Sequence, residues 1–136
     1  MVIVAYIDGG ARGNPGPAGY GVRIEDEQGA LINEFNGFLG SATNNVAEYN
    51  GLLAALKYAQ QHGHRRVHIK SDSELLVKQM RGEYKIKNAA LVDLSLEAKR
   101  HERDIASVRY TAVRREHNKL ADRLVNDALD HEAKRL

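Results

Sequence analysis

The sequence predicts an α/β protein with a mixed sheet, and three patterns support this class. Residues 2–7 form an unbroken apolar run, which is typical of a strand covered on both faces. Residues 20–39 are extended around a turn at 26–29, which predicts an antiparallel hairpin. A helix pattern over 43–62 precedes an apolar run over 65–70, and a strand–helix–strand step of this kind makes the new strand parallel to an earlier one.

The rest of the chain continues this alternation of helices and strands. We expect a helix over 75–81, a short connection over 82–88, a helix over 89–103, a strand over 105–113, a polar loop over 114–118 and a helix over 119–134. With 136 residues the chain is long enough to bury a sizeable core, so we expect one domain over residues 1–136.

Composition narrows the classes of function. The absence of cysteine excludes disulfides, a thiol nucleophile and thiolate metal sites, and it fits a reducing cytoplasm. We see no charged leader before residue 2, no apolar run long enough to span a membrane and no heptad pattern, so we expect a cytoplasmic monomer. The net charge is only +2, from 20 basic and 18 acidic residues. If four of the carboxylates lie together in one site, the rest of the protein has 20 basic and 14 acidic residues and a net charge of +6. A basic surface around an acidic pocket suits a polyanion.

Two aspartates follow predicted strands directly. Asp8 comes after the run at 2–7, and Asp72 follows the strand at 65–70. Open α/β sheets bind their ligands at the carboxyl ends of strands, so both positions are candidates for a site. Each also has a simpler interpretation, since Asp8 can cap a turn and Asp72 can lie within a capping box of Ser71 and Glu74.

Two further carboxylates lie on predicted helices. Glu48 falls on the stripe of helix 43–62 that faces the sheet, where an unpaired carboxylate is costly. Its simpler interpretation is a capping box in which Asn45 is the N-cap. Asp122 lies near the start of the last helix, where it complements the helix dipole and where Asn118 can act as the cap.

The four carboxylates converge at one edge if the strands ending at Asp8 and Asp72 are adjacent and parallel. Asp8, Glu48, Asp72 and Asp122 would then repel one another and take up protons unless a cation balanced them. Oxygen donors of this kind select Mg²⁺ or Mn²⁺. Two such ions about 4 Å apart can activate a water and stabilise the leaving oxygen in phosphodiester hydrolysis.

The order of these carboxylates and their surroundings resemble type 1 ribonuclease H. The matching segments are YIDGG at 6–10, GNPGPAGYG at 13–21, TNNVAE at 43–48, SDS at 71–73 and NKLAD at 118–122. The resemblance spans essentially the whole chain. It implies a ribonuclease H-like fold, in which a five-stranded mixed sheet of order 3-2-1-4-5 has helices on both faces. It also implies that the four carboxylates are the metal ligands and that the RNA strand of an RNA/DNA hybrid is cut to leave 3′-hydroxyl and 5′-phosphate ends.

The same resemblance implies residues that bind the substrate. Asn14, Asn44 and Asn45 match positions that touch the hybrid near its minor groove, where the 2′-hydroxyl distinguishes RNA from DNA. Neutral amides suit this task because they both donate and accept hydrogen bonds. Thr43 and Asn88 match members of a pocket for a phosphate of the DNA strand, although helix capping is an alternative interpretation for Thr43 and Asn44.

Two departures from the family pattern concern residues 82–88 and His117. Many relatives carry a basic, Trp-containing protrusion that binds the substrate. This chain lacks Trp and has only the short segment 82–88 at that place. Lys85 and Lys87 would be a reduced substitute for the basic residues of the protrusion. Many relatives also have a long loop with a mobile histidine before the last aspartate. Here His117 lies five residues before Asp122, and it either assists product release or is a solvated loop residue, with Asn118 as a further candidate.

The sequence therefore predicts a magnesium-dependent endoribonuclease that acts on RNA/DNA hybrids and weakly on duplex RNA. One alternative is a nuclease of the same fold that acts on duplex RNA or DNA junctions. Another is a module that binds hybrids without cutting them. Four carboxylates gathered in one place favour the enzyme, because a binding module gains nothing from their repulsion.

Overall fold

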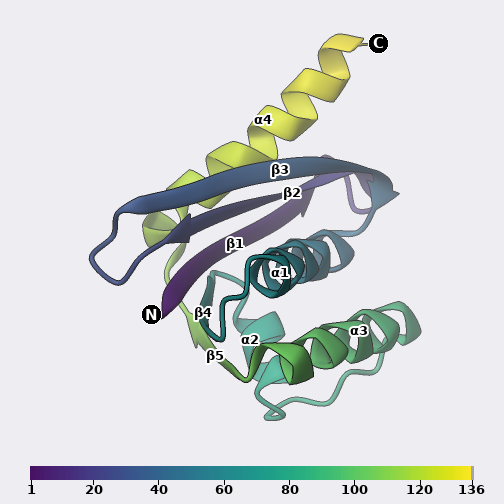
Figure 1. The fold of residues 1–136 in the computed structure, drawn as a ribbon. Helices are drawn as coiled ribbons and strands as arrows, with labels where there is room; N and C mark the ends of the chain where they lie inside the picture. Colours follow the sequence, from purple (N-terminus) through teal and green to yellow (C-terminus); the bar gives the residue numbers. More distant parts are fainter. Residues whose placement is uncertain (136) are drawn as a thin grey trace.

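The computed structural model describes residues 1–135 and contains a five-stranded sheet flanked by helices (Figure 1). The elements are β1 (Ile3–Ala11), β2 (Gly16–Glu25), β3 (Leu31–Ala42), α1 (Asn44–Gln61), β4 (Arg66–Ser71), α2 (Glu74–Met80), α3 (Ala89–Ile105), β5 (Ser107–Ala112), a one-turn 3₁₀ helix η1 (Arg115–His117) and α4 (Lys119–Arg135).

The strand order is β3-β2-β1-β4-β5, which confirms the predicted sheet with β1 at its centre. β1 pairs antiparallel with β2 and parallel with β4, and β5 continues the parallel half. The last parallel pair between β1 and β4 joins Ile7 to Ser71. Asp8 and Asp72 both follow this pair directly, so the topology brings them to the same edge.

The sequence pattern predicted that the first strand ends before Asp8, but the strand continues past it. β1 continues to Ala11 because its antiparallel neighbour keeps pairing with it, through Gly9 with Tyr20 and Ala11 with Ala18. β2 accordingly begins at Gly16, after a connection of only four residues (12–15) and before residue 20, where the sequence pattern placed the start of the hairpin. Asp8 therefore follows the last residue of β1 that pairs with β4, but it is still paired with Gly21 of β2 and lies inside the strand.

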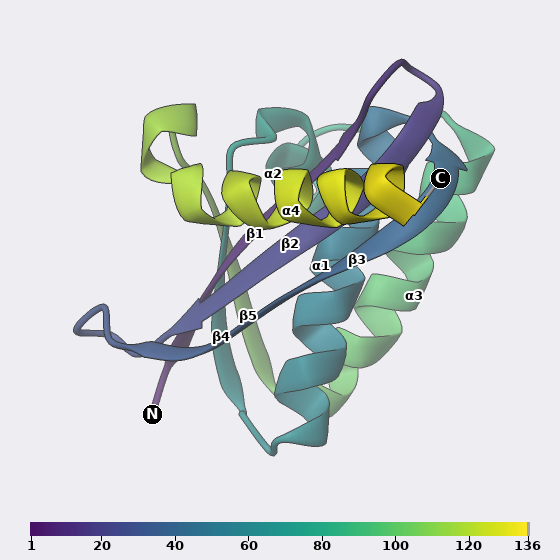
Figure 2. The same cartoon turned by 90° about the horizontal axis from the view of Figure 1, so that it is seen from above.

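Helices cover both faces of the sheet, as predicted (Figures 1 and 2). α1 packs on β1 and β2 with α3 beside it, and α4 crosses β1, β2 and β3 on the opposite face. Two glycines permit this close approach. A Cβ atom on Gly9 would lie 2.2 Å from the Ala47 carbonyl carbon in α1, and one on Gly21 would lie 2.5 Å from the Ala121 carbonyl oxygen in α4. The two helices that carry Glu48 and Asp122 are thus held against the sheet.

The helix caps differ from two of the predicted ones. Thr43 caps α1, with its Oγ1 accepting a hydrogen bond from the Val46 amide at 3.2 Å, so Asn45 is not the N-cap. Ser73 caps α2 in the same way, which places Ser71 outside the capping box that we expected. In both cases the residue directly before the helix accepts, through its side-chain oxygen, a hydrogen bond from the amide three positions later. Glu48 therefore lies beyond the first turn of α1 and plays no part in its capping.

The boundary between α3 and β5 also differs from the predicted one. Ile105 is the last residue of α3, and Ala106 follows with a φ of 96°, a left-handed conformation that ends the helix. β5 then runs from Ser107, two residues later than expected.

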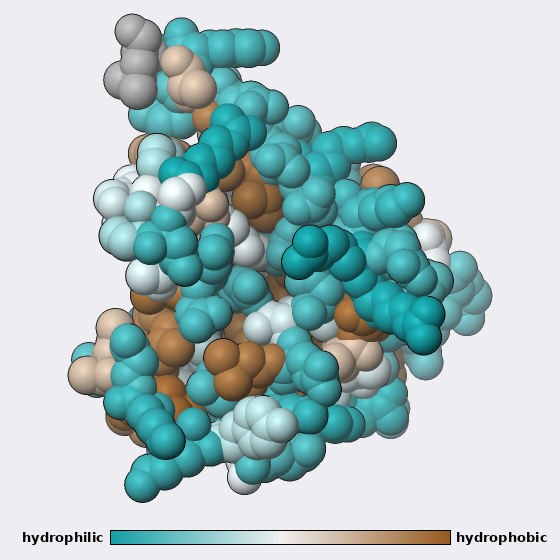
Figure 3. Space-filling view, turned by 180° about the vertical axis from the view of Figure 1, so that it is seen from behind, coloured by the Kyte–Doolittle hydropathy of each residue, from teal (hydrophilic) through white to brown (hydrophobic). Residues whose placement is uncertain are grey.

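Polar side chains dominate the face of the molecule seen in Figure 3, and its apolar areas are small and separate. Within residues 1–135 no helix has both the length and the apolar character needed to cross a membrane.

Candidate active site

The structure brings the four carboxylates together at one hollow in the surface. Asp8, Glu48, Asp72 and Asp122 all line a cavity of about 420 Å³ beside the end of the parallel pairing. They come from four different elements, namely β1, α1, the residue after β4 and the first turn of α4. This convergence is the arrangement that the strand topology predicted.

Burial differs among the four carboxylates. Asp8 is the deepest at 8% exposure, Glu48 and Asp72 are partly buried, and Asp122 is exposed at the rim. Asp8 thus forms the floor of the cavity while Asp122 faces solvent. A ligand entering from solvent would meet the carboxylates on one side and be in contact with water on the other.

Burial and mutual repulsion favour the protonated forms of the inner carboxylates. Burial raises the pKa of Asp8 to about 8, with the Asp72 carboxylate adding to the effect. Burial likewise raises the pKa of Glu48 to about 7, against a hydrogen bond with Ser73, and it raises the pKa of Asp72. The site therefore holds protons near neutral pH unless a cation replaces them.

The donor set fits a hard divalent cation. Every candidate ligand is a carboxylate oxygen, and Glu48 Oε2 is buried without a hydrogen-bond partner, as an oxygen reserved for a cation would be. Within residues 1–135 no three acidic, histidine or cysteine side chains are already close enough to form a cage. The four carboxylates have the chemistry of a metal site, and a cation would draw them together.

Metal is expected to stabilise the folded chain, because it relieves carboxylate repulsion that exists only in the native state. The melting temperature should rise by several degrees on adding Mg²⁺ or Mn²⁺, and changing Asp8 and Asp72 together to Asn should remove the rise. Thermal denaturation with and without each metal measures it. An undiminished rise in the double variant would place the metal elsewhere.

Arg115 is a site residue that the sequence reasoning missed. It projects from η1 into the same cavity, and its positive charge lowers the pKa values of Glu48 and Asp72 against the effect of burial. A guanidinium among carboxylates that await a cation is also positioned to meet a phosphate. The only signal in the sequence was the position of Arg115 in the polar loop before the last helix.

Asn118 connects two parts of the site. We expected its side chain to cap α4, but its Oδ1 accepts no hydrogen bond from any of residues 1–135. Its Nδ2 donates to the Ile7 carbonyl at 2.9 Å, and the residue is 1% exposed. Its backbone carbonyl accepts the hydrogen bond from the Asp122 amide. Asn118 therefore links the start of α4 to the residue before Asp8, which fixes Asp122 relative to Asp8.

His117 is not among the residues that the structure brings to the carboxylates. Its side chain is 69% exposed, and its nearest charged neighbour is Glu116, with Nε2 4.0 Å from the carboxylate. It lines a different groove, beside Tyr6 and Lys119. A role in product release would require the η1 segment to move, and it stays a prediction.

Two of the three predicted asparagines, Asn14 and Asn44, form a connected group beside the cavity. Asn44 lines the cavity, and its side-chain Oδ1 accepts a hydrogen bond from the Ala11 backbone amide at 2.8 Å. The backbone amide of Asn44 in turn donates to Asn14 Oδ1 at 3.0 Å. Asn45 is exposed in the first turn of α1. Because the two bonded side chains use their oxygens, their NH₂ groups are the parts left for a substrate.

Thr43 and Asn88 cap the two helices that lie side by side. Asn88 Oδ1 accepts from the Leu91 amide at 3.2 Å, as Thr43 does for α1. Figures 1 and 2 show that α1 and α3 run in the same direction, so their amino ends lie on the same side of the molecule. Capping and phosphate binding are compatible, since helix amino ends favour anions.

Lys85 and Lys87 lie exposed in the connection before α3, and neither forms an ion pair within the described part of the chain. Changing both to Ala should weaken hybrid binding and reduce the slope of log affinity against log salt by about 0.9 for each phosphate that the variant no longer neutralises. Turnover at saturating substrate should change little. Binding titrations across a salt series provide the measurement, and an unaltered slope would exclude these lysines from the interface.

This topology, with its acidic edge, is that of the ribonuclease H-like class of proteins. A family model described as reverse transcriptase-like matches residues 6–128. The crystal structure of RNase H1 from Halobacterium salinarum superimposes with a TM-score of 0.93 at 36% identity, over 96% of this chain and 99% of that one. The chain belongs to the type 1 ribonuclease H family.

Other relatives agree with this assignment. The N-terminal RNase H domain of Rv2228c from Mycobacterium tuberculosis has a TM-score of 0.93 at 41% identity, over 98% of this chain and 97% of that one. LC11-RNase H1 in complex with an RNA/DNA hybrid has a TM-score of 0.92 at 41% identity, over 96% of this chain and 99% of that one. The chain spans only 36% of the full bifunctional protein Rv2228c and 63% of the Halobacterium salinarum ribonuclease HI sequence.

Proposed function

We propose that this chain is a metal-dependent endoribonuclease that hydrolyses the RNA strand of RNA/DNA hybrids and leaves 3′-hydroxyl and 5′-phosphate ends. The observation that carries the proposal is the convergence of Asp8, Glu48, Asp72 and Asp122 on one cavity. Four carboxylates held together lower the stability of a protein that does not use them. Family membership and the hybrid bound to LC11-RNase H1 support the choice of substrate.

The four carboxylates would hold Mg²⁺, with Mn²⁺ as a possible substitute and two ions in the substrate complex. Metal bound there would supply a nucleophilic water and stabilise the leaving oxygen. Asp8 fixes the floor of the site from a central strand, and Asn118 holds the start of α4 in register with it. Arg115 adds a positive charge at the same cavity, where it can neutralise the scissile phosphate as the substrate arrives.

The asparagine group would read the sugar of the strand that is cut. Asn14 and Asn44 are tied to each other and to the end of β1, so their NH₂ groups are held in place before the substrate binds. Preorganised donors lose little freedom on binding. Thr43 and Asn88 would meet the DNA strand at the helix amino ends. A single domain, a cytoplasmic location and a monomeric state stay predictions from the sequence.

A cleavage assay with strand-labelled RNA/DNA hybrid tests the proposal. We expect internal cuts in the RNA strand when Mg²⁺ is present and none when a chelator replaces it. Treating the products with a phosphatase before gel electrophoresis reports the 5′-phosphate ends. Tight binding of the hybrid without any cleavage in Mg²⁺ or Mn²⁺ would instead favour a binding module.

A further inference from the structure

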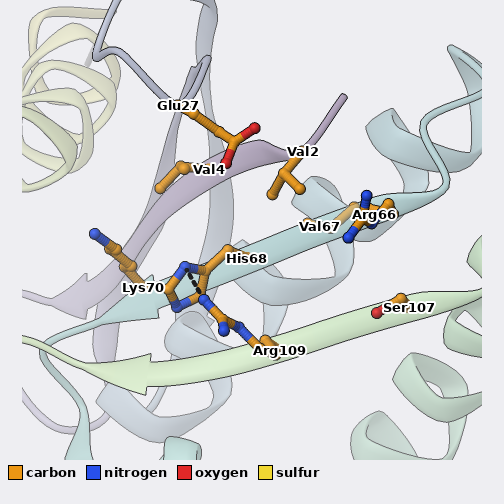
Figure 4. A pocket seen from close by; sticks show the side chains of 9 residues that line it. All are labelled: Val2, Val4, Glu27, Arg66, Val67, His68, Lys70, Ser107 and Arg109. Carbon is orange, nitrogen blue, oxygen red and sulfur yellow. Dashed lines mark hydrogen bonds between the residues drawn. The ribbon is translucent and has the colours of Figure 1, made fainter.

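A second hollow, away from the carboxylates, lies on the open face of β4 and β5 (Figure 4). It has a volume of about 420 Å³, and Arg66, His68 and Lys70 of β4 and Arg109 of β5 line it. We call these four residues the basic groove. The proposed function assigns them no role.

Strand alternation places the basic groove on the face opposite the core. Val67 and Ile69 point into the core at 3% and 0% exposure, so Arg66, His68 and Lys70 share the other face. α4 packs on β1, β2 and β3 and leaves this part of the sheet open to solvent. The groove is therefore a sheet surface with its own set of side chains.

The charge of the groove is unbalanced. Glu27 is the one acidic residue that lines it, and none of the ion pairs found in residues 1–135 involves Arg66, Lys70 or Arg109. Like charges on neighbouring strands are destabilising. A surface that gathers cations without partners is one that an anion would stabilise.

His68 arranges its neighbours within the groove. Its Nε2 lies 2.6 Å from Thr111 Oγ1, and its Nδ1 lies 3.2 Å from an Arg109 guanidinium nitrogen, as the dashed line in Figure 4 marks. Burial, Arg109 and Lys70 lower the pKa of His68, so the ring is neutral and Nδ1 accepts from Arg109. Arg109 is thereby oriented without a carboxylate, which leaves its charge available.

The spacing of the cations fits one extended polyanion. Arg66 and Lys70 are four residues apart on β4, and Arg109 of β5 pairs with His68, midway between them, so the three positive groups recur about every 6.6 Å along the strand direction. One line of positive groups at this interval matches one sugar–phosphate backbone, whereas a duplex presents two. Lys70 also lies over the Tyr6 ring, with its Nζ 5.5 Å from the centroid, and aromatic rings beside basic grooves stack unpaired bases.

The groove also leads towards the candidate active site. Lys70 is two residues before Asp72, and Tyr6, which pairs with Lys70, is two residues before Asp8. We propose that the basic groove binds an unpaired extension of the substrate, with the backbone phosphates on Arg66, Lys70 and Arg109. This inference deepens the proposed function and rests on it, because the extension belongs to a hybrid held at the carboxylates.

The test compares two double variants that remove the same charge. Arg66→Gln with Arg109→Gln disrupts the groove, and Arg100→Gln with Arg103→Gln removes two exposed arginines from α3. Fluorescence anisotropy in chelator measures the affinity for a blunt hybrid, for the same hybrid with an unpaired extension at each strand end in turn, and for an unpaired oligonucleotide alone. Circular dichroism verifies that each variant is folded.

We expect wild type to bind at least one extended hybrid about five- to tenfold more tightly than the blunt one at low salt. The groove variant should lose this gain, keep its affinity for the blunt hybrid, and show a salt slope on the extended hybrid that is shallower by about 1.4, as expected when two phosphates of a single strand are no longer neutralised. The α3 variant should keep the gain.

Three results would overturn the inference. They are no gain from any extension in wild type, a gain that survives in the groove variant, and an equal loss in both variants. In the first of these cases, binding of polyglutamate by wild type that is lost in the groove variant would point to an acidic protein partner instead. The unpaired oligonucleotide separates this inference from the proposed function: weaker binding in the groove variant alone supports the groove even if the blunt hybrid is neither bound nor cut.

Discussion

Asp8→Asn should lower kcat/KM for hybrid cleavage about a thousandfold or more while the fold is kept. Asp8 is the deepest of the four carboxylates, at 8% exposure, and it projects from the central strand. Asparagine has the same shape but lacks the negative charge that would hold a divalent cation. Metal catalysis contributes several kcal/mol, and at about 1.4 kcal/mol per factor of ten a loss of about 4 kcal/mol gives the stated effect.

The same substitution should stabilise the metal-free protein at alkaline pH. The pKa of Asp8 is raised from 3.8 to about 8 in the fold, mainly by burial. A raised carboxyl pKa means that the contribution of this group to stability is complete below the unfolded value and is lost as the pH rises through the folded value. Wild type in chelator should therefore lose melting temperature between about pH 4 and pH 8 relative to Asp8→Asn, by several degrees.

Matched measurements separate these effects from a general loss of charge. Asp93→Asn removes an exposed carboxylate of α3 and should change neither turnover nor the pH dependence of melting. Circular dichroism and a gel assay on both variants complete the comparison. Wild-type turnover by folded Asp8→Asn would refute the metal-site proposal, and a pH-independent difference in melting temperature would refute the buried, protonated state of Asp8.

The architecture and the position of the acidic residues at one edge of the sheet were predictable because they depend on patterns that can be recognised in the sequence itself. Apolar runs identify the strands, and the strand–helix–strand step predicts the parallel pair that ends at Ile7 and Ser71. Once that pair is known, Asp8 and Asp72 must lie at one edge. Glu48 was found because a carboxylate on a core-facing stripe requires a partner.

Details that depend on side-chain reach were not predictable from the sequence alone. Several polar residues near each helix start offered equivalent caps, and only the backbone path selects Thr43 and Ser73 over Asn45 and Ser71. Arg115 was missed because η1 is too short to have a periodic pattern, so nothing in the sequence indicates where its side chain points. The Asn118 side chain donates a hydrogen bond to the Ile7 carbonyl, 111 residues away in the sequence. Neighbouring residues in the sequence do not indicate such a long-range contact.

Discrimination between RNA and DNA should be the second large effect. We expect efficient cleavage of RNA/DNA, slow or metal-dependent cleavage of RNA/RNA, and kcat/KM on DNA/DNA lower by about a thousandfold or more. A DNA strand lacks the 2′-hydroxyls that Asn14, Asn44 and Asn45 would bind, which leaves polar groups of the site unpaired. The alignment of the scissile phosphate would suffer as well, because in-line attack tolerates little displacement.

Asn44→Ala with Asn45→Ala should raise KM for the hybrid about tenfold and narrow its advantage over RNA/RNA. Asn44 also accepts the Ala11 amide, so its loss frees a hydrogen bond at the end of β1 and should lower stability by about 1 kcal/mol. Asn45→Ala alone separates the two causes, because Asn45 is exposed and its side chain makes no hydrogen bond within residues 1–135. Its effect should appear in KM without a change in melting temperature.

The decisive measurement is kcat/KM for wild type and both variants on three duplexes of one sequence. If the asparagines read the sugar, the single variant should reduce the ratio of RNA/DNA to RNA/RNA cleavage, and the double variant should reduce it further. Equal losses on both duplexes would mean that the amides only position the duplex. Comparable cutting of DNA/DNA by wild type would contradict the proposed substrate altogether and favour a nuclease of DNA junctions, since the carboxylates alone do not distinguish one phosphodiester from another.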